Sequence, residues 1–231
     1  LSRDNFKIDN MKKILLLVLF CSFTSASDFK SYTADFAFET KFGDFPLKRY
    51  FTVKEDSINT RVKMQVLWLK YSLDSNFTIQ NNTVVSINTK VEDPFRDDPK
   101  KFSATFNENM IYSNELKEVE HTAMVLEQLA SDVQVRINAK NSLKNYKLSI
   151  FDNTKGEVVE KDYNQIGTEI VKTPFGDVET IVVEASAEDV GPITYYIAPS
   201  YDFMIIRSTA ALKNGELRVL KITEAPKFLE E

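Results

Sequence analysis

Apolar and polar side chains alternate along most of the chain, which is the pattern of strands that bury one face. In the first such run Tyr32, Ala34, Phe36 and Phe38 share one parity, and Thr33, Asp35, Glu39 and Lys41 fall on the other. Gly43-Asp44 provides a tight turn before the next run. The alternation predicts strands over residues 32–42, 45–53, 58–71, 77–79, 84–89, 102–106, 146–151, 157–163, 166–172, 178–185, 193–198, 203–212 and 217–223.

A helical period replaces the strand period once, in a segment that begins at Val119 and ends at Lys140. Apolar residues recur there at helical spacing, and polar residues lie off that face. The apolar positions are Thr122, Leu126, Leu129, Val133 and Ile137, and the polar ones Glu127, Gln128, Asp132 and Arg136. The expected fold is therefore mainly β: a curved or barrel-like antiparallel sheet of meanders with one central helix packed on it.

Turn residues mark the connections between these strands. Asn214-Gly215 is the strongest hairpin dipeptide in the chain. The segment from Glu92 to Lys101 holds two prolines and mixed charges, so it is expected to be a solvated, mobile loop whose role the sequence leaves open.

The N-terminal part has the pattern of a leader. A signal peptide is expected to begin at Met11, with Lys12 and Lys13 before an apolar run, and to end at Ala26. Residues 1–10 are interpreted as an upstream extension, and residues 27–231 as a single β-rich envelope domain. The apolar run is shorter than the ~20 residues that span a bilayer, so the mature chain is expected to be exported, periplasmic and without an integral membrane span.

Composition narrows the candidate chemistry. The only cysteine, Cys21, lies in the leader, so disulfides and thiolate sites are not expected in the mature chain. The net charge is −5, and Lys and Glu alternate rather than form a basic stripe, which disfavours nucleic acid as a partner.

A catalytic or metal site has little support in the sequence. His121 is the only histidine and stands at the start of the expected helix, and there is no Gly-x-Ser-x-Gly motif for a nucleophile. The acidic residues between Glu92 and Asp98 lack the spacing and glycine of a calcium loop. The chain is therefore expected to be no enzyme and to hold no cofactor or metal.

Three segments of the C-terminal third resemble the signature of an exported-protein family catalogued as domain of unknown function 3108. They are Gly167-Thr168-Glu169-Ile170, residues 173–180 with the Thr-Pro-x-Gly turn, and residues 195–203 with Ala198-Pro199; Arg207 stands at the family's final arginine. Tyr196 replaces the usual Trp and Ile205 the usual Pro, so the chain is identified as a divergent member. The resemblance implies a β-rich envelope protein without an established activity.

The leading hypothesis is a non-enzymatic envelope protein that binds a lipid-like or other amphiphilic ligand in a groove of the curved sheet. Its ligand-binding residues are expected to be Phe36, Phe38, Trp68, Tyr196 and Arg207, with Arg207 either holding an anionic head group or pairing with Asp202 or a neighbouring carboxylate. The alternative is a structural or protein-interaction module of the envelope, with an envelope protein as partner. A hydrolase is the third hypothesis.

Overall fold

The computed structural model describes residues 29–40, 43–96, 98, 100–187, 190–211 and 216–229. The expected leader and the Asn214-Gly215 turn lie outside these residues. The strands are β1 (Tyr32–Thr40), β2 (Gly43–Val53), β3 (Ile58–Val66), β4 (Leu69–Gln80), β5 (Thr83–Glu92), β6 (Lys101–Phe106), β7 (Met110–Ser113), β8 (Val119–Glu120), β9 (Val125–Leu126), β10 (Asn145–Asp152), β11 (Glu157–Thr173), β12 (Gly176–Ala187), β13 (Val190–Ala198), β14 (Met204–Ala211), β15 (Leu217–Ile222) and β16 (Lys227–Phe228). One helix, α2 (Gln128–Lys140), and one 3-10 turn, η2 (Pro199–Tyr201), complete the described elements.

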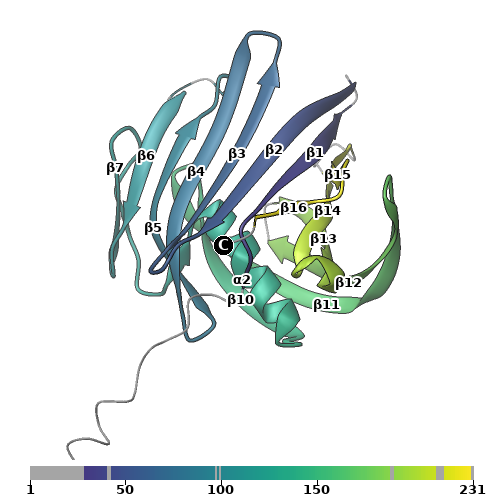
Figure 1. The fold of residues 1–231 in the computed structure, drawn as a ribbon. Helices are drawn as coiled ribbons and strands as arrows, with labels where there is room; N and C mark the ends of the chain where they lie inside the picture. Colours follow the sequence, from purple (N-terminus) through teal and green to yellow (C-terminus); the bar gives the residue numbers. More distant parts are fainter. Residues whose placement is uncertain are drawn as a thin grey trace, which may run out of the picture.

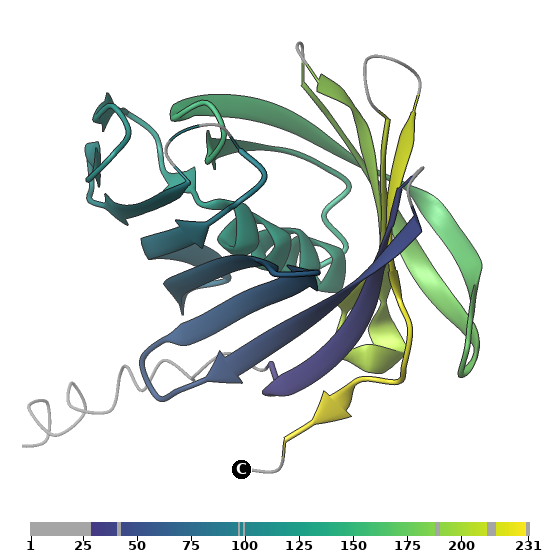
Figure 2. The same cartoon turned by 90° about the horizontal axis from the view of Figure 1, so that it is seen from above.

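All described strands belong to one sheet, in the order β8-β7-β6-β5-β4-β3-β2-β1-β15-β14-β13-β12-β11-β10-β9, with β16 beside β1. Two meanders are therefore joined where β1 pairs with β15, and the register there sets Phe36 opposite Ile222. The sheet curls strongly, as Figures 1 and 2 show. In the strand order of the described residues, β8 and β9 are the two ends and do not pair with each other. The expected curved antiparallel sheet with one helix is confirmed.

Helix α2 lies inside the curl of the sheet, with strands on either side of it (Figure 2). Its apolar side chains enter three separate core clusters: Val133 and Ile137 the first, Leu129 the second, and Val135 the third. Ten of its 13 residues are buried. The helix therefore packs on the concave side of the sheet and contributes to all three core clusters.

In the first part of strand β1, the alternation of apolar and polar residues predicted correctly which side chains are buried. Tyr32, Ala34 and Phe36 are buried, while Thr33 and Asp35 are only half-buried. The two strands expected over residues 157–172 form the single strand β11, in which a register shift between Gln165 and Gly167 breaks the alternation.

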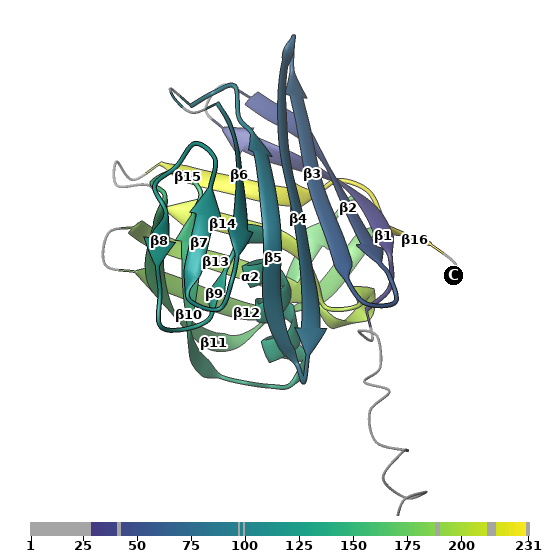
Figure 3. The ribbon, with the colours of Figure 1, turned by 90° about the vertical axis from the view of Figure 1, so that its left-hand side faces the viewer.

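The expected long third strand is wrong at its end. The chain turns at Leu67 and Trp68, so that Val66 pairs with Leu69 and β4 runs back along β3. Leu67 has a φ of 54°, a left-handed value that turn residues such as Gly and Asn adopt more readily. The turn carries none of the usual sequence signals. Figure 3 shows this hairpin projecting beyond the ends of the neighbouring strands.

The expected helix start at Val119 is also wrong. Residues 119–120 form β8, and Val125–Leu126 form β9, which pairs in parallel with Ser149 and Ile150 of β10. The helix begins at Gln128, because Glu127 has extended backbone and caps it by accepting a hydrogen bond from the Ala130 amide. His121 therefore lies between β8 and β9, outside the helix.

Candidate functional site

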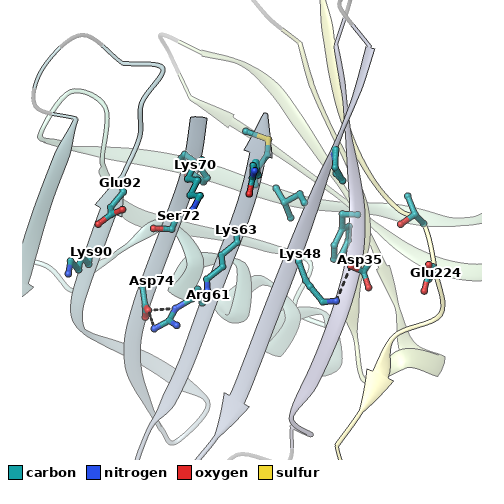
Figure 4. A pocket seen from close by; sticks show the side chains of 17 residues that line it. Asp35, Lys48, Arg61, Lys63, Lys70, Ser72, Asp74, Lys90, Glu92 and Glu224 are labelled. Atoms are coloured by element: carbon teal, nitrogen blue, oxygen red, sulfur yellow. Dashed lines mark hydrogen bonds and ion pairs between the residues drawn. The ribbon is translucent and has the colours of Figure 1, made fainter. Parts of the chain in front are cut away.

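A groove of about 720 Å³ crosses strands β1 to β5 on the face of the sheet that points away from α2. Figure 4 shows its labelled side chains on that face, with the helix behind the strands. The groove is lined by Asp35, Phe36, Pro46, Leu47, Lys48, Arg61, Lys63, Met64, Gln65, Lys70, Tyr71, Ser72, Asp74, Lys90, Glu92, Thr223 and Glu224.

The floor and the walls of the groove come from different rows of the sheet. Phe36, Leu47, Met64 and Tyr71 are partners in successive strands and form one row across the sheet. Phe36 is buried in the core, and the members of such a row point to the same side. The backbone of this row therefore forms the floor of the groove. The side chains of the outward-facing rows on either side form its polar walls.

Several of the wall charges neutralise one another. Lys48 Nζ lies 3.4 Å from Asp35 Oδ1, and Arg61 forms an ion pair and a hydrogen bond with Asp74. Asp74 also accepts a hydrogen bond from Asn59 Nδ2 at 2.7 Å. Across β5 and β6, Lys101 Nζ lies 3.4 Å from Glu92 Oε1. Each of these wall carboxylates is thus already engaged.

Three lysines of the walls have no ion-pair partner among the described residues: Lys63 on β3, Lys70 on β4 and Lys90 on β5. Lys90 stands opposite Asp74 in the ladder, but the Asp74 carboxylate is taken by Arg61 and Asn59. Lys63 stands opposite Lys48, and its ammonium lies 5.7 Å from the centre of the Tyr50 ring. Like charges directly opposite one another destabilise a sheet, and here only Lys48 of the two is paired, with Asp35, among the described residues. These three ammonium groups stand in a groove that is also lined by the carboxylates of Asp35, Asp74, Glu92 and Glu224.

The inner face holds charged groups of a different kind. Arg136 of α2 is 1% exposed, and its guanidinium lies 4.3 Å from the centre of the Phe29 ring and 5.0 Å from that of Phe51. Its Nε donates to the Phe203 carbonyl at 3.1 Å and its Nη2 to the Asp202 carbonyl at 2.9 Å. This side chain ties the helix to the turn between η2 and β14.

A second group of inner charges ties the start of the helix to β2. Arg49 Nη1 donates to Asp132 Oδ2 at 3.1 Å. Glu127 is fully buried, and burial raises the pKa of its carboxyl to about 7, although the amides at the helix start favour its charged form. Glu127 Oε2 has no hydrogen-bond partner among the described residues. The sequence pattern had placed Glu127 and Asp132 away from the core, and the position of the helix inside the sheet encloses them.

The five ligand-binding residues expected from the sequence are not gathered in one place. Phe36 belongs to the first core cluster, and Tyr196 packs against that cluster. The Arg207 guanidinium lies over the Tyr196 ring at 5.1 Å, while Asp202 Oδ2, one of the partners considered for Arg207, lies 3.7 Å from Arg136 Nη2. Phe38 is half-buried opposite Phe45 and Leu220.

Trp68 is separate from all of these residues, because it is 79% exposed at the β3–β4 turn. Phe36 is the member of the expected set that also contributes to the outer groove. The groove lysines were missed because single exposed lysines on strands give no signal in a sequence. Only the register of three strands brings them together.

The other chemical candidates are not assembled among the described residues. His121 Nδ1 contacts the Ala123 carbonyl at 2.7 Å, and Nε2 has no hydrogen-bond partner within the described ranges. No three His, Cys, Asp or Glu side chains of the described chain are placed to share a metal ion. In the loop from Glu92 to Lys101, Arg96 donates to the carbonyls of Asn153 and Thr154, and the Asp93 amide donates to the Lys100 carbonyl at 2.7 Å.

The fold has a counterpart among solved structures. A β-barrel-like protein of a domain of unknown function, DUF1849, from Brucella abortus has a TM-score of 0.56 and 10% identity, covering 87% of this chain and 99% of that one. At this identity the likeness concerns the fold alone. The MucA/MucB complex of Pseudomonas aeruginosa has a TM-score of 0.41 and 8% identity, covering 87% of this chain and 53% of that one. That score is too low to add to the description of the fold.

No family model matches the chain, and no curated protein matches it. The fold is thus shared with a domain of unknown function, while membership of the family catalogued as 3108 is not confirmed. Within the described residues, no helix is both long and apolar enough to cross a membrane.

Proposed function

We propose that this protein is an exported, non-enzymatic binding module that holds an anionic amphiphile by its head group in the outer groove of β1 to β5. The observation that carries the proposal is a set of three lysines, Lys63, Lys70 and Lys90, from three neighbouring strands. None of them has an ion-pair partner in the part of the chain that the structure describes. Ammonium groups that face one groove favour a phosphate or carboxylate ligand, because each can donate charge-assisted hydrogen bonds to it.

The position of the groove refines the sequence-based hypothesis. That hypothesis placed an amphiphile in an apolar hollow on the concave side of the sheet, but α2 and its three core clusters occupy this side. The groove on the opposite face offers polar walls and a backbone floor. The polar walls therefore support a proposal in which the protein recognises the head group of the amphiphile.

The first experiment asks whether the protein carries a ligand. Protein exported to a bacterial periplasm and purified without detergent is examined by native mass spectrometry, and bound molecules are extracted with solvent. A discrete adduct that is lost on denaturation and extracts as an acidic lipid is expected. A clean apo mass with no thermal shift from acidic lipids contradicts the proposal and favours a structural or protein-interaction module.

The second experiment locates the ligand. Binding of soluble dihexanoyl phosphatidylglycerol is compared with binding of the zwitterionic dihexanoyl phosphatidylcholine. The double variant Lys63→Glu/Lys90→Glu is expected to lose at least about tenfold in affinity for the acidic lipid. The control Lys117→Glu/Lys144→Glu changes the net charge equally at exposed lysines outside the groove and is expected to bind normally. Equal losses in both variants would show that only net charge matters.

A further inference from the structure

The β3–β4 turn is the most exposed apolar feature of the described chain. Leu67 is 74% and Trp68 79% exposed, higher fractions than those of the other exposed large apolar residues. Isolated apolar residues on a surface are ordinary. Here, however, two large neighbouring side chains stand together at the tip of a hairpin that projects beyond its neighbours (Figure 3).

The opposite end of β4 provides a comparison within the same strand. The β4–β5 turn also has two residues, Asn81 and Asn82, both with left-handed φ values of 51° and 64°. Asparagine tolerates this backbone region well. The β3–β4 turn requires a left-handed φ of 54° at Leu67, where a leucine side chain is unfavourable. Folding alone favours a small or polar residue there, so the apolar pair indicates a role outside the fold.

The strained turn is nevertheless held in shape. Gln65 Nε2 donates to the Leu67 carbonyl at 3.0 Å, which fixes the side of the turn that carries the strained residue. The tip is therefore presented in a defined conformation, and a partner would not need to order it on binding.

Cationic side chains lie on the strands directly below the tip. Lys70 is two residues from Trp68 and stands opposite Gln65, and Lys63 is two residues before Gln65. Neither lysine has an ion-pair partner among the described residues. At the surface of an anionic bilayer, indole rings lie at the level of the head groups and lysines are attracted to acidic lipids. The exposed Leu67–Trp68 pair with ammonium groups below it has this same order.

We infer that the Leu67–Trp68 tip inserts into the surface of a membrane that contains anionic lipid, with Lys70 and Lys63 lying at the level of the head groups. This inference uses two lysines of the groove and so rests in part on the proposed function. It assigns a separate role to the tip, which brings the groove to the surface where acidic amphiphiles reside.

Trp68 is the only tryptophan of the chain, so intrinsic fluorescence reports on the tip alone. Full-length exported protein is titrated with vesicles of phosphatidylcholine alone and with vesicles that also contain phosphatidylglycerol. A blue shift of the emission is expected with the acidic vesicles, and the shift should weaken as salt is raised. An unchanged emission with both vesicles overturns the inference, and an equal shift with both overturns the assignment of anionic lipid.

Variants of the turn separate binding from folding. Leu67→Gly/Trp68→Ser places a favourable hairpin pair at the tip, so the melting temperature should not fall. Its co-sedimentation with acidic vesicles is expected to drop about tenfold or more for the two lost side chains. The control Leu143→Ser removes an exposed leucine from the loop after α2 and is expected to sediment like the parent. Undiminished sedimentation of the turn variant overturns the inference.

The outcomes distinguish this inference from the proposed function. If the turn variant binds soluble dihexanoyl phosphatidylglycerol normally but no longer sediments with vesicles, both proposals are supported. If the parent protein shifts its Trp68 emission with acidic vesicles yet does not bind the soluble acidic lipid, the tip is a membrane contact and the groove proposal fails. If the parent protein binds the soluble acidic lipid but its Trp68 emission does not shift with acidic vesicles, the inference about the tip fails and the groove proposal stands.

Discussion

The inner side of the sheet, with α2 packed on it, and the outer face of β3 to β5 both present cationic side chains, but their surroundings differ. On the inner face, Arg49 and Arg136 are buried and bind Asp132, backbone carbonyls or aromatic rings. On the outer face, Lys63, Lys70 and Lys90 are exposed and have no ion-pair partner among the described residues.

The difference separates charges that hold the fold from charges that are available to a ligand. Buried arginines lose their hydration on folding and must recover that free energy from hydrogen bonds and packing within the protein. Exposed lysines keep their water, and their removal changes stability little. Substitution on the inner face should therefore act on the free energy of unfolding, and substitution on the outer face on binding.

The largest expected effect is on the inner face. Arg136→Ala removes a cation that joins α2 to the carbonyls of Asp202 and Phe203, and it leaves a hole beside the Phe29 and Phe51 rings. The free energy of unfolding is expected to fall by about 3–5 kcal/mol, measured by urea denaturation. Arg61→Ala is the matched outer-face variant and should cost less than about 1 kcal/mol. Similar losses in the two variants would remove the distinction between the faces.

A smaller effect depends on pH. Burial raises the pKa of Glu127 from its ordinary 4.5 to about 7, so the folded protein holds a proton that the unfolded chain releases between these pH values. Stability is therefore expected to fall by about 3 kcal/mol as pH rises from 4.5 to 7. In Glu127→Gln the side chain is uncharged throughout and can still accept from the Ala130 amide, so this part of the slope should disappear. Parallel urea midpoints against pH for both proteins would contradict the assignment.

The alternation of apolar and polar residues predicted those features of the fold that depend on residues close together in the sequence. Alternation gave the buried parity of Tyr32, Ala34 and Phe36 and the curved sheet around one helix. It could not show that Val125 and Leu126 form a strand, because their pairing with β10 joins residues far apart in sequence. Leu126 happens to continue the helical spacing of Leu129 and Val133, which moved the expected helix start too far forward.

The candidate site was less predictable than the fold. Trp68 continues the apolar parity of β3, and a turn without Gly, Asn or Pro gave no reason to end the strand before it. Arg136 looks like a surface residue of an amphipathic helix, and it is buried only because the sheet encloses the helix on several sides. The groove lysines lie in three strands, so their proximity follows from register alone.

The smallest expected effect tests whether the outer charges cost stability. Lys63 lies directly opposite Lys48, and Lys63→Glu replaces this repulsion by attraction, so the free energy of unfolding should rise by about 0.5 kcal/mol. Lys70 lies opposite the neutral Gln65, so Lys70→Glu is the control and should leave stability within about 0.5 kcal/mol of the parent. Both variants should weaken binding of acidic lipid.

Urea midpoints and lipid affinities measured on the same preparations test both expectations for these outer lysines. A gain in stability together with a loss of binding in Lys63→Glu would mean that the Lys48–Lys63 pair disfavours folding and serves the ligand. If Lys63→Glu instead lowers stability, the pair is supported by contacts such as the Tyr50 ring beneath Lys63. The outer face would then be held together by its charges as the inner face is.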